Sequence, residues 1–236
     1  MAERMELYKK QTIMKKLILL VSIVFCFTQM IHAQMLTPSE SDPAAKVILQ
    51  NLKRQYDKYS SVEIDFQLTR TASDDTDIQK GKIIQQGKNF NVNSRDFQII
   101  SDDKSLWFFN RDHNNVQISD AEYEESDEIM SPLDILKLYN SNNYVYAIVD
   151  KKNTKNGTLN YIEFKPLDKF SEYSKIRVVV NEKINKIVSL TVFMKDSTRL
   201  LFEISNQVTD KKYDSATFSF NEKDHPGINK EDLRIE

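Results

Sequence analysis

The segment Val62-Glu63-Ile64-Asp65-Phe66-Gln67-Leu68-Thr69 is the clearest indication of the fold. Its apolar residues alternate with polar ones, which is the two-residue period of a β-strand with one buried and one solvated face. The same period recurs in short segments on both sides, separated by polar turns. Strands are expected near 61–71, 78–86, 89–94, 97–101, 105–110, 115–119, 144–150, 158–165, 173–181, 186–195, 198–207 and 216–220.

Two segments with helical spacing interrupt this series of strands. The first is expected over 43–59, with Ser41 or Asp42 as its cap and a proline in its first turn. Its apolar stripe would consist of Ala44, Val47, Ile48, Leu52, Tyr56 and Tyr59. The second segment is a short helix that begins at Ser131-Pro132 and runs to about Tyr139.

Helical crossovers are absent between most strands, so sequence neighbours are expected to pair antiparallel. Asn156-Gly157 and Asp102-Asp103 supply residues that tight hairpin turns favour. A long antiparallel sheet can curl until it is nearly a barrel, and the two helices would bury their apolar residues against its apolar face. Such a fold, mainly β with α-helices, encloses or half-encloses an apolar space, which side chains either fill or leave open for a ligand.

Residues 14–34 predict where the protein works. Met14-Lys15-Lys16 is a short basic start, Leu17 to Phe27 is an apolar run, and Ile31-His32-Ala33 ends in a small residue. These are the three regions of a secretory signal peptide, and the apolar run is shorter than the ~20 residues that span a bilayer. We therefore expect residues 1–33 to be a signal peptide, with Met14 as an alternative start, and 34–236 to be a single exported domain.

Cysteine and charge content narrow the function classes. The one cysteine, Cys26, lies in the apolar run of the signal peptide, so the mature chain would hold its fold without disulfides. Removing residues 1–33 takes away five basic and two acidic residues, which moves the formal net charge from −2 to −5. That charge argues against nucleic acid as a partner and gives no reason to expect docking on an anionic membrane surface.

No arrangement of residues in the mature chain points to catalysis. His113 and His225 lack metal-ligand spacing and read as exposed loop histidines. The whole chain has four glycines and no phosphate-binding loop, and its scattered carboxylates form no evident acid–base pair. The acidic run from Asp120 to Glu128 is either a solvated loop or a docking patch for a basic partner. The chain reads as a binding protein without a metal or cofactor, not as an enzyme.

Several motifs, taken in order, resemble one known family. Ile100-Ser101-Asp102-Asp103-Lys104-Ser105-Leu106-Trp107-Phe108-Phe109-Asn110 is similar to a hairpin of the LolA-type outer-membrane lipoprotein carriers. Tyr59 to Gln67 resembles their first strand, Gln79 to Ile83 their second, and Ser131 to Leu138 their central helix. Ala216 to Ile228 resembles their C-terminal ending. The resemblance covers nearly all of the mature chain.

This resemblance implies a fold and a task. Members of the family fold as an incomplete, curled antiparallel β-barrel, here of about eleven strands, closed by the N-terminal and central helices over a hydrophobic cavity. They accept acylated lipoproteins that an inner-membrane ABC transporter releases. They carry them across the periplasm and pass them to an acceptor at the outer membrane. The chain would accordingly be a periplasmic carrier, and we expect it to be a monomer.

Residues on the apolar face of the expected strands are candidates to line the lipid-binding cavity. They are Val62, Ile64, Phe66, Leu68, Trp107, Phe109, Val178, Val180, Leu190, Val192 and Phe202. On the central helix, Leu133, Leu136 and Leu138 are candidates for a lid that packs there when the cavity is empty. For any one of these residues, plain core packing is an equally good interpretation.

The chain departs from the family at one position. Family members carry an arginine after the second strand, and the resemblance implies that this arginine latches the helical lid. Residues 85–90 read Gln-Gln-Gly-Lys-Asn-Phe and contain no arginine. Lys88 is the candidate to replace it as a latch.

Other functions remain open at this point. The same fold would serve a periplasmic lipid or glycolipid carrier, or a sensor, because a fold does not determine a function. A protein with a filled core would instead use a sheet edge or the acidic run to bind a partner, without lipid. The bound cargo separates these alternatives, since it would be a lipoprotein, a free lipid or nothing.

Overall fold

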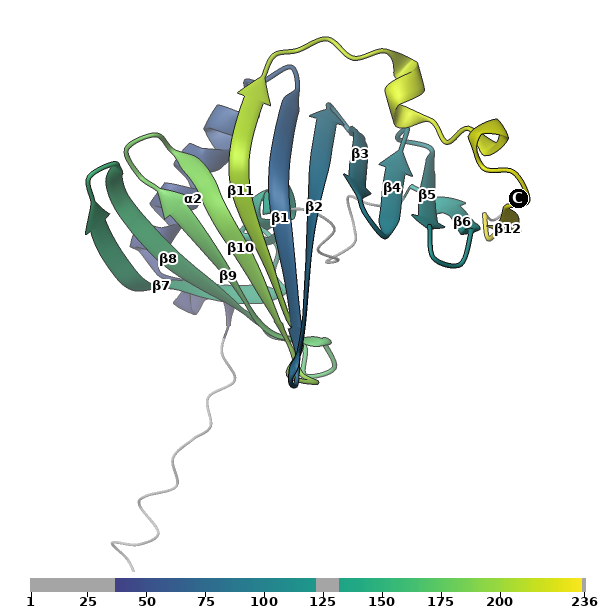
Figure 1. The fold of residues 1–236 in the computed structure, drawn as a ribbon. Helices are drawn as coiled ribbons and strands as arrows, with labels where there is room; N and C mark the ends of the chain where they lie inside the picture. The colour runs from purple at the N-terminus through teal and green to yellow at the C-terminus, as the bar shows by residue number, and fades with distance from the viewer. Residues whose placement is uncertain (1–36, 122–131, 235–236) are drawn as a thin grey trace, which may run out of the picture. The chain divides into compact units, whose positions relative to one another are not determined.

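The computed structural model describes residues 37–121 and 132–234, and it builds one twelve-stranded sheet from them. The strands are β1 (Val62–Ala72), β2 (Asp75–Gln86), β3 (Asn89–Ser94), β4 (Phe97–Ser101), β5 (Ser105–Asn110), β6 (Asn115–Asp120), β7 (Tyr144–Thr154), β8 (Gly157–Pro166), β9 (Tyr173–Asn181), β10 (Lys186–Met194), β11 (Arg199–Thr209) and β12 (Asn229–Asp232). Their order is β12-β6-β5-β4-β3-β2-β1-β11-β10-β9-β8-β7 (Figure 1). Since β7 and β12 form the two ends of this order, the sheet is not closed. The expected curled, incomplete barrel is confirmed.

The strand that indicates the fold most clearly lies in the middle of this order. β1 pairs antiparallel with β2 on one side and with β11 on the other, so Phe66 lies opposite both Gly81 and Ile204. The expected tight turns are present at both predicted positions, where Gly157 has a φ of 121° and Asp103 a φ of 71°. A positive φ suits glycine and aspartate better than most residues, which is why these dipeptides marked the turns.

One strand prediction is wrong. Residues 216–220 were expected to extend, but Ser215–Phe218 forms a short 3-10 helix, η3. Phe218 is buried, and the side-chain amide of Asn91 donates to the carbonyl of Thr217 at 2.7 Å, so this segment is held across the sheet and not along it. The twelfth strand is Asn229–Asp232, which pairs parallel with β6. Its residues are poor strand formers, and the pairing rests on tertiary contacts.

The N-terminal helix α2 (Pro43–Tyr56) is shorter than the predicted 43–59, and its predicted stripe is confirmed in part. Ile48, Leu52, Tyr56 and Tyr59 belong to or pack on the main apolar cluster, whereas Ala44 is exposed. A short 3-10 turn, η1 (Pro38–Glu40), precedes it. The residues of α2 that are buried are Ala45, Leu49, Leu52 and Tyr56, whereas Val47, expected in the apolar stripe, is 55% exposed. Asp42 joins the start of the helix to β7. It caps the helix by accepting from the amide of Ala44 at 2.8 Å, and its other carboxylate oxygen accepts from the amide of Ile148 in β7 at 3.2 Å.

The central helix is present over 132–138 as a 3-10 turn, η2 (Pro132–Asp134), followed by α3 (Ile135–Leu138). Its expected first residue, Ser131, lies outside the described residues. So do the predicted signal peptide with Cys26 and the part of the acidic run from residue 122 onward. Within the described ranges, no helix is long and apolar enough to cross a membrane.

The buried apolar side chains form two clusters on opposite faces of the sheet. The main cluster joins α2, η2 and α3 to one face of β1–β4 and β7–β11, which we call the inner face. The second, smaller cluster lies on the outer face of β5 and β6. It consists of Phe109, Val116 and Ile118 with Trp107, Phe220 and Ile228 against them.

The C-terminal arm, residues 210–234, crosses the outer face from the end of β11 to β12 beside β6 (Figure 1). It contains η3 and a second 3-10 turn, η4 (Glu222–Asp224). Glu63 on β1 holds the start of the arm, because it accepts a hydrogen bond from the hydroxyl of Tyr213 and lies 3.1 Å from Lys211 Nζ. Lys82 Nζ lies 2.5 Å from the same carboxylate. The hydrogen bonds from Lys82, Tyr213 and Lys211 lower the pKa of Glu63 to about 2.

Glu63→Gln is therefore expected to lower the free energy of unfolding by about 1–2 kcal/mol at pH 7. Because the pKa is lower in the folded state than in the unfolded chain, the stabilisation is present above about pH 4.5 and fades as the pH falls toward 2. Urea unfolding of the variant and the wild type at both pH values measures this. Glu203→Gln, on the exposed outer side of β11, is the control and should change little. An equal gap between wild type and Glu63→Gln at pH 7 and pH 2 would contradict the assignment.

Candidate functional site

The structure gathers most of the predicted cavity residues on the inner face. Nine of the eleven belong to the main cluster and are at most 5% exposed: Val62, Ile64, Phe66, Leu68, Val178, Val180, Leu190, Val192 and Phe202. The three predicted lid residues, Leu133, Leu136 and Leu138, belong to the same cluster. The central helix therefore packs directly on the face that was predicted to line the cavity.

Trp107 and Phe109 are not brought together with the other nine residues. They belong to the second cluster, where the ring of Phe109 lies 5.4 Å from that of Phe220. Their neighbour Leu106 packs on the main cluster instead. Residues 106–109 are all apolar, so the alternation on β5 does not reveal which of them face inward. The C-terminal arm covers the outer face of β5 and thereby buries the apolar side chains on it.

A pocket of about 590 Å³ opens where the two helical elements meet the sheet. Its lining comes from five parts of the chain: α2 with the turn after it, the start of β1, the β2–β3 turn, η2 and α3. The lining residues are Lys53, Tyr56, Asp57, Tyr59, Ser61, Val62, Gln85, Gly87, Leu133, Asp134, Leu136, Lys137 and Asn140. Three predicted site residues, Val62, Leu133 and Leu136, are among them. The volume falls within the range of about 300–1,000 Å³ that is usual for ligand pockets.

The more exposed residues of the lining, which form the rim, are mostly polar. The buried ones, which form the floor, are mostly apolar apart from Ser61 and Asp134. Lys53 lies 2.6 Å from Asp57, and Lys137 lies 3.7 Å from Asp134. Deeper in, the hydroxyl of Tyr56 donates to Gln207 Oε1 at 2.8 Å, and burial raises the pKa of this tyrosine. An apolar chain with a polar head matches this arrangement, since the chain would contact the floor and the head the rim.

Hydrogen bonds anchor α2 at three places along its length. At its start, the amide of Asp42 donates to the carbonyl of Tyr146 at 2.8 Å. Near its end, the side chain of Asn185 donates to the carbonyl of Asn51 at 3.0 Å, and the hydroxyl of Tyr56 is bonded to Gln207. Moving α2 would break all three attachments.

Lys88, the predicted latch, lies in the β2–β3 turn next to Gly87, a residue of the pocket lining. Its Nζ is 3.7 Å from Asp103 Oδ1 in the β4–β5 turn, and both side chains are more than half exposed. An exposed ion pair of this kind contributes about 0–1 kcal/mol.

Sequence reasoning missed several residues of the site. Tyr56 and Tyr59 were expected as members of a helical stripe but not as pocket residues. Ile83, Phe90, Val92, Tyr144, Tyr146, Ile162, Phe164 and Ile176 also join the inner-face cluster. For β8 and β9 the signal was available, because Ile162 and Phe164, like Ile176, continue the alternation. The polar rim residues come from turns, whose spatial neighbours no periodic pattern reveals.

The two histidines of the mature chain lie outside this site. His113 is exposed in the β5–β6 turn, as expected. His225 corrects the prediction of an exposed loop residue, since its ring is half-buried, 4.3 Å from that of Phe109 and stacked on Phe220 at 4.9 Å. Among the described residues, no group of three His, Cys, Asp or Glu side chains is placed to hold a metal ion.

The comparisons with known proteins agree with this architecture. The family model described as outer membrane lipoprotein carrier protein LolA matches residues 57–221. An uncharacterized conserved protein from Thermus thermophilus has the same fold, with a TM-score of 0.52 at 8% identity over 81% of this chain and 99% of that chain. No curated protein matches the chain.

Two further solved structures are less similar. A LolA superfamily protein from Nitrosomonas europaea gives a TM-score of 0.41 at 13% identity, covering 75% of this chain and 97% of that one. A DUF1329 family protein from Desulfovibrio piger gives 0.42 at 13% identity, covering 76% and 98%. The fold of the family is a binding or carrier fold. Because the family model matches well over half of its residues, the chain belongs to the LolA family of outer membrane lipoprotein carrier proteins.

Proposed function

We propose that this protein is a periplasmic carrier that binds the acyl chains of lipoproteins released from the inner membrane and delivers them to the outer membrane. The observation that supports this most strongly is the pocket between the two helical elements and the inner face. It joins a polar rim to an apolar face that only α2, η2 and α3 cover among the described residues. An acyl chain placed there would replace the leucines of η2 and α3 on the sheet.

The energetics of such an exchange are balanced. Exposing a buried leucine costs about 1.5–3 kcal/mol, so displacing Leu133, Leu136 and Leu138 would cost roughly 6 kcal/mol. Each CH2 group of an acyl chain that leaves water contributes about 0.8 kcal/mol. About eight buried CH2 groups therefore offset the displaced leucines, and further groups favour binding. A carrier must also release its cargo, and a near-balanced exchange permits this.

The remaining parts of the proposal concern place and partners. Residues 1–33 would direct export and be removed. An inner-membrane ABC transporter would supply the lipoprotein, an outer-membrane acceptor would take it, and the carrier would work as a monomer. Transfer of this kind needs no bond chemistry, so the protein would be neither an enzyme nor dependent on a cofactor.

Native mass spectrometry of the mature chain, purified gently from the periplasm of an expressing host, tests the proposal. We expect additional mass that resolves to an acylated polypeptide. A free phospholipid or glycolipid alone would support the cavity but contradict the lipoprotein cargo. A bare mass that stays unchanged after addition of solubilised lipoprotein would contradict the carrier function and favour a docking protein.

Lys88→Ala tests the proposed latch. If Lys88 holds the lid, hydrogen exchange in residues 132–139 should rise, by at most about fivefold, because an exposed ion pair contributes no more than about 1 kcal/mol. Asp103→Asn removes the charge that pairs with Lys88 and leaves the lysine in place. Equal exchange in the wild type and Lys88→Ala would refute the latch. A rise in both variants would assign the effect to the Lys88–Asp103 pair.

A further inference from the structure

The β8–β9 loop carries an apolar side chain that the fold does not bury. Phe170 is 79% exposed, the highest value among the exposed large apolar side chains of the described residues. Its loop is well fixed by hydrogen bonds. Asp168 Oδ1 accepts from the amide of Phe170 at 2.8 Å, and the amide of Lys195 in the β10–β11 turn donates to the carbonyl of Glu172 at 2.9 Å. The exposure of the ring therefore belongs to an ordered loop.

Basic side chains surround this ring. Lys169 Nζ lies 4.9 Å from the centre of the Phe170 ring, and Lys195 Nζ donates to the carbonyl of Lys169 at 2.5 Å. Two residues before Lys195, a second aromatic ring, Phe193, lies on the outer face of β10. Three cations approach that ring, with Lys175 at 4.7 Å, Arg177 at 5.4 Å and Arg199 at 5.5 Å.

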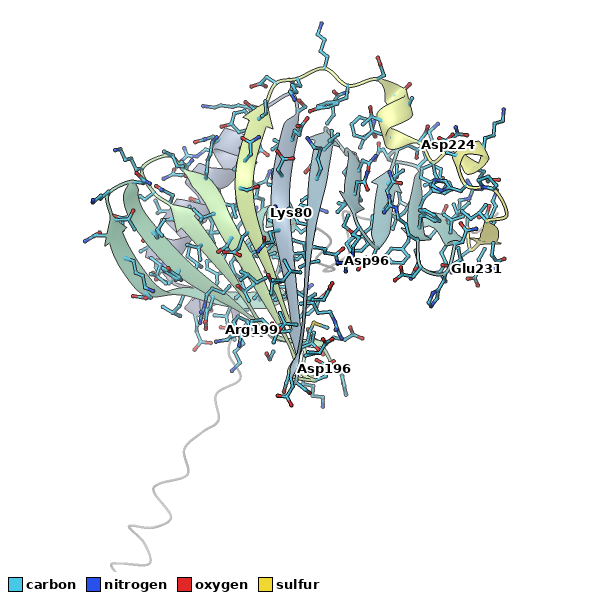
Figure 2. All side chains as sticks on the ribbon, viewed as in Figure 1. Lys80, Asp96, Asp196, Arg199, Asp224 and Glu231 are labelled. Atoms are coloured by element: carbon cyan, nitrogen blue, oxygen red, sulfur yellow. The ribbon has the colours of Figure 1, made fainter. Side chains whose placement is uncertain are left out.

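The pairing register places Phe193 and the basic residues around it side by side on one surface. Phe193 lies opposite Lys175 on β9 and opposite Arg199 on β11. Figure 2 shows Arg199 and Asp196 at the end of the sheet where β10 turns into β11, away from Asp224 and Glu231 on the C-terminal arm. We call this surface the aromatic–basic tip; its members are Lys169, Phe170, Lys175, Arg177, Phe193, Lys195 and Arg199.

Carboxylates are also present at the tip, and three of them, Asp168, Glu172 and Asp196, are exposed. Glu163 pairs with Lys175 at 2.9 Å and with Arg177. Asp168 and Asp196 each accept from an amide of their own turn at 2.8 Å. Glu172 and the acidic β1–β2 turn border the surface. The guanidinium of Arg199 forms no ion pair with any described residue. Lys169 and Lys195 likewise form no ion pair with a described residue, so three cations of the tip are not neutralised by direct pairing with a carboxylate.

The net charge of −5 gave no reason to expect docking on an anionic membrane, but the cations of the tip are gathered locally. We propose that the aromatic–basic tip docks the protein on a lipid bilayer that carries anionic phosphate headgroups. Phe170 would enter the interface, and the cations beside it would contact phosphates. Aromatic rings flanked by lysine and arginine prefer this boundary, and each cation near an anionic surface adds attraction. A single protruding ring does not offer the roughly 800 Å² per partner that specific protein complexes bury, whereas a bilayer needs no matching pocket.

The tip and the pocket lie at different ends of β1. Val62, at the start of the strand, lines the pocket, while Thr71, near its other end, pairs with Arg199. Nine residues of extended strand separate them by about 30 Å. Docking through the tip would thus leave the pocket free for a protein partner. It does not depend on the carrier function proposed above.

Co-sedimentation of the mature protein with vesicles tests the proposal. We expect binding to vesicles of phosphatidylcholine with phosphatidylglycerol, and weaker binding to phosphatidylcholine alone or at high salt. Phe170→Ser should weaken binding about tenfold and Arg199→Gln about fivefold. Ile184→Ser is the matched control, because Ile184 is 51% exposed in the turn at the other end of β9. Lys183→Gln, in the same turn, is the control for charge.

Each possible result either supports or overturns docking through the tip. Loss of binding in Phe170→Ser and Arg199→Gln, with both controls unchanged, would support the tip. Equal loss in the controls, or no binding to any vesicle, would overturn it. Vesicle binding that persists in a protein unable to take up lipoprotein would support the tip while counting against the carrier function.

Discussion

Leu136→Glu is expected to weaken acyl-chain binding by about a hundredfold or more while leaving the sheet folded. Leu136 is 9% exposed, lines the pocket and packs on the inner face. A carboxylate at this position would have to be buried against the acyl chain, which is costly without a partner. Because the side chain lies at the pocket, it can turn toward solvent in the empty protein, so the strands should survive. Titration with a fluorescent triacylated lipopeptide and circular dichroism measure the two effects.

Two matched variants make this result specific. Val47→Glu places the same charge on the exposed side of α2, where Val47 is 55% exposed, and should leave binding unchanged. Leu136→Met preserves volume and apolarity and should change binding little. Normal affinity in a folded Leu136→Glu protein would refute the assignment of Leu136 to the acyl-chain site.

Gly81→Ala is expected to lower the free energy of unfolding by about 3 kcal/mol. A Cβ atom at Gly81 would lie 2.3 Å from Phe66 Cζ and 2.7 Å from the carbonyl oxygen of Asn93. Phe66 is 2% exposed and its ring is 5.6 Å from that of Phe202, so it has little room to move. Urea unfolding gives the change in free energy.

The control for Gly81→Ala is Gly87→Ala, where nothing lies within 4 Å of the new Cβ but φ is +61°. That change should cost only about 1 kcal/mol, from backbone strain. Adding Phe66→Leu to Gly81→Ala should recover part of the loss, since the smaller side chain relieves one of the two contacts. A Gly81→Ala protein as stable as the wild type would show that β1 and β2 pack less closely than described.

The sheet was predictable because its strands alternate cleanly. On β1, Val62 to Thr69 places every second side chain on the inner face, and the pattern gives both the element and its buried side. On β5 the residues Leu106 to Phe109 are all apolar, so the sequence identified the strand without its orientation. Trp107 and Phe109 face outward, where Phe220 and Ile228 of the C-terminal arm cover them.

Tertiary contacts decided the parts that the sequence predicted wrongly. On α2, Ala45 and Leu49 are buried and Val47 is exposed, a difference of one position from the predicted stripe, while Asp42 joins the helix cap to β7. Residues 216–220 alternate like a strand, but Phe218 is buried against the sheet and Thr217 is bonded to Asn91. β12 is the opposite case: its sequence does not predict a strand. Its charged residues have low strand propensity, and pairing with the edge of β6 holds them extended.

The candidate site was only partly predictable for the same reason. Alternation identified the inner-face residues, and helical spacing identified the leucines of η2 and α3 that are proposed as a lid. The pocket itself arises where the end of α2, the β2–β3 turn and η2–α3 meet. Its rim residues, such as Lys53 and Asn140, belong to no shared pattern, and only their spatial proximity gives them a role.

Photo-cross-linking can locate the acyl chains, which we expect to bind between the helices and the inner face. A lipopeptide with a diazirine in one acyl chain would be bound to the mature protein, irradiated, and its adducts mapped by mass spectrometry. We expect adducts at Val62, Leu133 and Leu136 and on the inner face beyond them. Adducts confined to Trp107, Phe109 and the C-terminal arm, or none above those of a non-acylated peptide, would contradict the account.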